Sequence, residues 1–85
     1  MTWRVEFHPS ARAELLKLDR PIQKRVLRDL HKLAADPHAA GSVKALKGSD
    51  EYRLRVGDWR VVDTLHDSVL MVLVMRIAHR REVYR

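Results

Sequence analysis

The sequence predicts a single α+β domain over residues 1–85, in which two helices cover one face of a small, mainly antiparallel sheet. Three observations support this prediction. Apolar and charged residues alternate near the N-terminus and again after residue 50, two intervening segments carry apolar residues at helical spacing, and Gly and Pro are few. A chain of 85 residues provides one modest hydrophobic core.

The first strand is predicted over residues 3–7, where apolar side chains at alternate positions are separated by charged ones. A helix follows, with His8 or Ser10 near its cap and Pro9 in the first turn, where proline is tolerated. The apolar stripe of this helix consists of Ala11, Leu15 and Leu18.

A second helix is predicted over residues 21–35, again with a proline, Pro21, in its first turn. It ends at Asp36, because a residue that precedes proline avoids the helical region. The apolar side of this helix consists of Ile22, Val26, Leu30 and Leu33. Four cations lie roughly opposite and form either a solvated face or a contact with RNA phosphates: Lys24, Arg25, Arg28 and Lys32.

A predicted loop over residues 38–50 leads to three strands, at residues 51–56, 59–66 and 69–78. Gly57 and Asp58 mark a tight reversal between the first two of these strands.

Further side chains on these strands are interpreted from their positions in the sequence. Met71 and Met75 alternate with Leu73, and we interpret this face of the last strand as core. Trp59 is interpreted as core or turn packing in preference to a platform on which a base stacks. Asp63 falls on the core-facing side of its strand, where a salt bridge to a nearby arginine is one explanation.

The overall charge favours an anionic partner, since the formal net charge is +6 at pH 7. Cysteine is absent and the five histidines lack a ligand spacing, so we expect no metal and no other cofactor. The N-terminus lacks the apolar run of a signal peptide, and the longest apolar run, residues 69–75, is too short to span a bilayer. We therefore expect a cytoplasmic protein without membrane attachment.

Candidate functional residues gather in the last third of the chain. Alternation places Arg53 and Arg55 on the strand face opposite Leu54, and Arg60 begins the next strand. The last strand leads to four more candidates: His79, Arg80, Arg81 and Tyr84. We predict that these side chains meet on one side of the sheet and form an anion site.

Three segments of the chain resemble the RelE/ParE toxin superfamily of bacterial toxin–antitoxin modules. They are Leu46-Lys47-Gly48, Tyr52-Arg53-Leu54-Arg55-Val56-Gly57-Asp58-Trp59-Arg60-Val61-Val62 and His79-Arg80-Arg81-Glu82-Val83-Tyr84. With the N-terminal strand and the two helices, the resemblance covers nearly the whole chain. It implies a small cytoplasmic toxin that a cognate, RelB-like antitoxin holds inactive, and a toxin–antitoxin complex that binds operator DNA.

The superfamily has two branches with different activities. RelE-type members cut mRNA in the ribosomal A site, whereas ParE-type members poison DNA gyrase and generally lack the basic catalytic set. The resemblance implies catalytic roles for Arg53, Arg55, Arg60, Arg80 and Tyr84, with Arg81 as a neighbour of Arg80. Because these positions are filled, the RelE branch is favoured, with the ParE branch as the alternative. Arginines stand where the best-known member has lysines, so a catalytically weak, antitoxin-binding remnant is a third interpretation.

RNA cleavage by this set would be attack of a ribose 2′-OH on the adjacent phosphate, which requires no metal. Arginine matches the geometry of a phosphate and stays charged, but for that reason it is a poor general base. We therefore assign the proton transfers to His79 and Tyr84, and leave open which is the acid and which the base.

Overall fold

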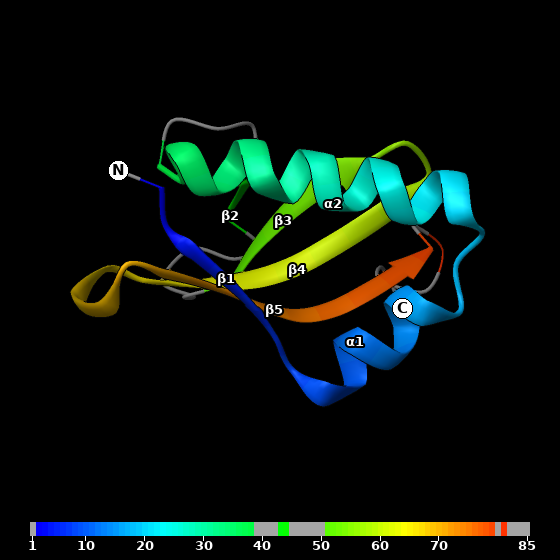
Figure 1. The fold of residues 1–85 in the computed structure, drawn as a ribbon, viewed down its shortest axis with the longest axis horizontal. Helices are drawn as coiled ribbons and strands as arrows, with labels where there is room; N and C mark the ends of the chain where they lie inside the picture. The colour runs from blue at the N-terminus through cyan, green and yellow to red at the C-terminus, as the bar shows by residue number, and fades with distance from the viewer. Residues whose placement is uncertain (1, 39–42, 45–50, 80, 82–85) are drawn as a thin grey trace.

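The computed structural model describes residues 2–38, 43–44, 51–79 and 81, and it shows one layer of helices on one sheet (Figure 1). The elements in chain order are β1 (Arg4–Phe7), α1 (Pro9–Leu16), α2 (Arg20–Ala35), β2 (Val43–Lys44), β3 (Glu51–Val56), β4 (Trp59–His66), the 3₁₀ turn η1 (Asp67–Val69) and β5 (Met71–His79). None of the described helices is long and apolar enough to cross a membrane.

The five strands form one sheet in the order β1-β5-β4-β3-β2. The β1 strand runs parallel to β5, and the other neighbours are antiparallel. This confirms the predicted α+β fold with a mainly antiparallel sheet. The prediction of a loop over residues 38–50 was wrong at Val43–Lys44, which pair with Tyr52 and Arg53 of β3. A strand of two residues is too short to show a period in the sequence.

Both helices have a proline in the first turn, as predicted: α1 begins at Pro9, and α2 begins at Arg20, one residue before Pro21. The His8 side chain caps α1, since its Nδ1 accepts a hydrogen bond from the backbone N–H of Ser10 at 3.2 Å. The two helices are joined by a short turn, across which Gln23 Nε2 donates to the Leu18 carbonyl at 2.9 Å. Side-chain hydrogen bonds therefore fix the direction of the chain at the start of each helix.

The hydrophobic core lies between the helices and one face of the sheet. In Figure 1, α2 lies along β3 and β4, and α1 lies beside the end of β5. The core joins residues of both helices to residues of three strands: Ala11, Leu15, Leu18, Val26, Leu30, Leu33, Leu54, Val56, Val61, Val72, Val74 and Ile77. Each fully buried aliphatic side chain of this kind contributes about 1.5–3 kcal/mol.

The face of β5 that packs in the core is not the predicted one. Met71, Leu73 and Met75 are half-buried on the opposite face, whereas Val72 and Val74 are fully buried. The β1 partners of Val72 and Val74 are Val5 and Phe7, which also pack against the core. Alternation cannot select a face in a strand that is apolar on both sides, so the pairing partners decide it.

An irregularity in the β4–β5 pairing changes the direction of the side chains that follow. Val62 pairs with Arg76 and Asp63 pairs with Val74, so Met75 is an extra residue on β5. Without it, Arg76 would share the core face with Val74. With it, Arg76 lies exposed on the far face, and Ile77 is buried in the core.

Asp63 is a carboxyl group inside the hydrophobic core. Its side chain is fully buried, and neither carboxyl oxygen has a hydrogen-bond partner among the described residues. The suggested salt bridge to an arginine is therefore absent from the described part of the chain. Burial raises the pKa of Asp63 from 3.8 to about 7, because desolvation penalises the charged form.

This buried carboxyl predicts a pH-dependent loss of stability. Between pH 3.8 and about 7 the folded protein keeps a proton that the unfolded chain has released, so stability falls as pH rises through this window. The Asp63→Asn variant cannot ionise and lacks this slope. We expect urea unfolding to show that the free energy of unfolding of Asp63→Asn, relative to that of the wild type, rises by up to about 4 kcal/mol between pH 4 and pH 8. An equal difference at both pH values would contradict this account.

Candidate functional site

The face of the sheet opposite the helices carries a group of arginines, which we call the arginine face: Arg53, Arg55, Arg60 and Arg76. Strand register explains their grouping. Arg55 pairs with Arg60, and Arg53 pairs with Val62, whose partner on β5 is Arg76. Neighbouring strands are about 4.8 Å apart, so these side chains rise from a small area at one end of the sheet. The structure thus brings together three predicted site residues.

Arg76 was not among the predicted site residues. The only signal in the sequence is a single cation within an otherwise apolar strand, and its face depends on the irregularity at Met75. Its guanidinium Nε lies 3.8 Å from Oε2 of Glu14 on α1, while Oε1 of Glu14 accepts a hydrogen bond from the Ile77 N–H at 2.9 Å. Glu14 therefore provides the hydrogen-bond acceptor for the Ile77 N–H, at the part of β5 that extends beyond the end of β1. The same carboxylate lies near Arg76 of the arginine face.

Arg60 differs from its neighbours because it is buried, with 9% of its surface exposed. Its Nη1 donates to the carbonyl oxygens of Gly57 at 3.1 Å and Trp59 at 3.0 Å. Gly57 occupies the turn with φ at +60°, a conformation that favours glycine. The guanidinium of Arg60 therefore holds the β3–β4 turn in place, and its charge lies beside Arg55.

His79 lies on the other face of the sheet from Arg60. Its partner across the strands is Trp59, whereas Arg60 pairs with Ala78. The His79 and Trp59 rings meet edge to face with centroids 5.6 Å apart. The register thus places His79 at the same end of the sheet as the arginine face but not on that face. Its Nδ1 accepts a long hydrogen bond of 3.4 Å from the backbone of Arg81, whose side chain is exposed.

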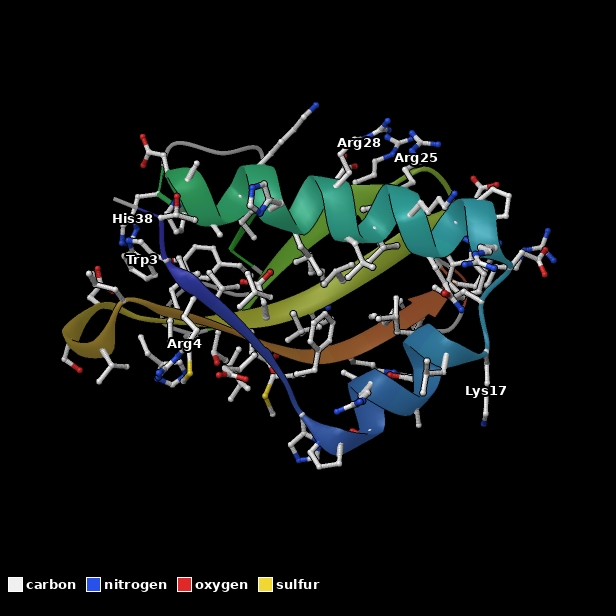
Figure 2. All side chains as sticks on the ribbon, viewed as in Figure 1. Trp3, Arg4, Lys17, Arg25, Arg28 and His38 are labelled. Atoms are coloured by element: carbon white, nitrogen blue, oxygen red, sulfur yellow. The ribbon has the colours of Figure 1, made fainter. Side chains whose placement is uncertain are left out.

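Two predicted residues, Arg80 and Tyr84, lie outside the described residues. The α2 cations are all exposed: Lys24, Arg25, Arg28 and Lys32. Figure 2 shows the side chains of Arg25 and Arg28 on the outer side of α2, away from the core. Arg25 also reaches the β3–β4 turn, since its Nη1 lies 3.2 Å from the position that a Cβ on Gly57 would occupy. Among the described residues, no group of three or more potential ligands could hold a metal ion.

Comparison with known proteins places this small basic domain among the toxins of type II toxin–antitoxin modules. A family model described as the ParE toxin of type II toxin–antitoxin system, parDE, matches residues 5–84, and the chain belongs to this family. A putative RelE-like toxin protein of Escherichia coli is 28% identical over 94% of this chain and 85% of its own length.

Solved structures give the same placement. The toxin–antitoxin complex RelBE2 from Mycobacterium tuberculosis contains a chain that is 25% identical, with a TM-score of 0.81 over 94% of this chain and 93% of that one. The isolated E. coli RelE toxin, at 21% identity, shares the fold, with a TM-score of 0.80 over 96% of this chain and 90% of its own. Both names of the superfamily thus occur among the matches, and the predicted RelE/ParE resemblance is confirmed.

The role of Arg60 in the turn predicts a loss of stability when its donors are removed. We expect Arg60→Met to lower the free energy of unfolding by about 1–2 kcal/mol, because two carbonyl oxygens lose a charged donor. Arg55→Met is the matched control, since it removes the same group from an exposed position on the paired strand. It should change stability by less than about 0.5 kcal/mol. Equal losses in urea unfolding would show that Arg60 does not hold the turn.

Proposed function

We propose that this toxin is a ribosome-dependent endoribonuclease that cleaves mRNA in the A site and thereby inhibits translation. The observation that supports this most directly is the grouping of Arg53, Arg55 and Arg60 on adjacent strands. Several guanidinium groups on one small surface form a site for the oxygens of a phosphate.

The proposed reaction is an internal transfer at phosphorus. The ribose 2′-oxygen attacks the adjacent phosphate, the bond to the 5′-oxygen breaks, and the products are a 2′,3′-cyclic phosphate and a 5′-hydroxyl. One proton leaves the 2′-OH and one joins the departing 5′-oxygen. In this proposal Arg53, Arg55, Arg60 and Arg80 stabilise the negative charge that develops on the phosphoryl oxygens. Arg76, the remaining member of the arginine face, adds its charge to this stabilisation in the proposal.

The two proton transfers are assigned to His79 and Tyr84. Histidine has an ordinary pKa near 6.5, and neighbouring cations favour ionisation of a tyrosine. His79 lies at the same end of the sheet as the arginine face but on the other face, against Trp59. The proposal therefore requires the RNA to pass around this end of the sheet. We expect the reaction to depend on the ribosome, because these two residues are a weak acid–base pair. The ribosome would compensate by orienting the 2′-OH for in-line attack on the phosphate.

The proposal includes three kinds of partner besides mRNA. The ribosome presents the substrate, and the exposed cations Arg81, Lys24, Arg25, Arg28 and Lys32 contact RNA phosphates. A RelB-like antitoxin inhibits the toxin, in line with the toxin–antitoxin complexes among the similar structures and the net charge of +6, which suits an acidic, extended peptide. The toxin–antitoxin complex in turn binds operator DNA. All of these activities belong to the cytoplasm.

Inhibition of DNA gyrase without RNA cleavage is the second candidate function. The match to the ParE toxin model over residues 5–84 favours it. The two candidates differ in what they require of the arginine face, since only a nuclease needs its charges at a reacting phosphate.

Removal of the paired strand arginines should abolish cleavage. In a translation reaction with a defined mRNA, mapped by primer extension, we expect breaks within the A-site codon. Arg53→Gln combined with Arg55→Gln should reduce the cleavage rate by at least about 100-fold, because two groups that stabilise the transition state are lost.

Arg12→Gln, which removes an exposed cation from α1, is the control and should cleave at the wild-type rate. Blocked translation without breaks would indicate a ribosome-binding inhibitor. No effect on translation, with inhibition of DNA supercoiling instead, would establish the gyrase function.

A further inference from the structure

A cavity of about 330 Å³ lies where α2 meets the β3–β4 turn, and we call it the hairpin cavity. Its lining comes from α2, from the end of β3 and from the turn: Ile22, Arg25, Arg55, Val56, Gly57, Asp58 and Trp59. The volume is at the lower end of the range for small-ligand sites, so it suits a group the size of one nucleotide. The arginine face adjoins it through Arg55, which belongs to both.

The lining divides into an apolar and a cationic part. Ile22 and Trp59 are half-buried and Val56 is buried, so they form an apolar wall. Arg25 and Arg55 are exposed cations on different elements, α2 and β3. The side chain of Arg55 lies on the sheet face opposite the helices, so Arg25 is the cation on the helix side of the cavity. Arg25 and Arg28 carry the same charge on the outer side of α2 (Figure 2), but only Arg25 lines the cavity.

Gly57 permits the approach of Arg25 to the turn. A Cβ at this position would stand 3.2 Å from Nη1 of Arg25 and 3.7 Å from its Cζ. Since Gly57 has no side chain, the guanidinium of Arg25 lies directly over the turn backbone. The guanidinium of Arg25 thereby lines the cavity, while the residue stays exposed to solvent.

We propose that the hairpin cavity binds one nucleotide of single-stranded RNA, with the base against Trp59 and Ile22 and its phosphate on the guanidinium of Arg25. Aromatic side chains bind bases by stacking without regard to sequence, and guanidinium groups bind phosphate. The choice of RNA as the ligand rests on the proposed function. The site makes Trp59 and Arg25 binding residues for a nucleotide next to the one that reacts.

An acidic peptide is the competing occupant, because it also carries negative charge. The lining favours a nucleotide over it. A carboxylate side chain contacts only the cationic part of the lining, whereas a nucleotide also packs its base against the apolar wall.

Fluorescence of Trp59 gives a direct test. The chain has two tryptophans, and Trp3 lies far from the cavity, edge to face with His38 at 5.6 Å between centroids. Figure 2 shows Trp3 and His38 at the other end of α2 from Arg25. In a Trp3→Phe background, Trp59 is the only tryptophan. The titrant is a 2′-O-methyl RNA tetranucleotide, which cannot be cleaved because its 2′-oxygens carry no proton.

We expect saturable quenching of Trp59, with binding about tenfold weaker in Arg25→Gln and restored in part by Arg25→Lys. Arg12→Gln should bind as tightly as the parent. Absence of quenching in the parent would overturn the proposal. So would equal losses in Arg25→Gln and Arg28→Gln, which would show a diffuse basic surface. Quenching by an acidic antitoxin peptide but not by RNA would also overturn it.

The outcome is separable from that of the nuclease proposal. Cleavage in the translation reaction by a protein whose Trp59 fluorescence does not respond to RNA would refute nucleotide binding in the hairpin cavity but not the nuclease function. Binding at Trp59 without cleavage of any mRNA would support the cavity and refute the nuclease.

Discussion

The pairing register of β3 with β4 is the constraint on which the site depends. Val56 pairs with Trp59, so only Gly57 and Asp58 form the turn. Because side chains alternate along a strand, a shift of one residue would turn Arg53 and Arg55 into the core. Glycine at positive φ permits the tight turn, and the bonds of Arg60 to its carbonyl oxygens hold it. One arginine thus maintains the geometry that the others need.

A second feature of the strand pairing, the extra residue Met75 on β5, also determines the positions of site residues. The extra residue there reverses the alternation of β5, which sends Arg76 to the arginine face and Ile77 into the core. The same stretch is anchored by Glu14, which accepts from the Ile77 N–H and lies near the Arg76 guanidinium. Asp63 lies next to this irregularity, and its carboxyl group is buried in the core without a hydrogen-bond partner among the described residues. Burial of this group is unfavourable for the stability of the fold.

Much of the fold could be predicted from local chemistry. The prolines mark both helix starts, Gly57 marks the hairpin, and the bounds of β3 and β4 agree with the predicted ranges. What could not be predicted depends on pairing. The core face of β5, the short β2 strand and the position of Arg76 follow from partners that are distant in sequence. For the same reason, alternation predicted the grouping of Arg53 and Arg55, but it could not show that His79 lies on the face of Trp59.

The central claim is that the arginine face performs chemistry on an RNA phosphate with the neighbouring 2′-OH as the nucleophile. The most direct test is a translation reaction on an mRNA that carries a single 2′-deoxynucleotide at the mapped cleavage position. The account predicts that cleavage at this position disappears, while an unmodified mRNA yields a fragment that ends in a 2′,3′-cyclic phosphate. Cleavage that persists at the deoxynucleotide would contradict the account, because no 2′-OH would be present to attack.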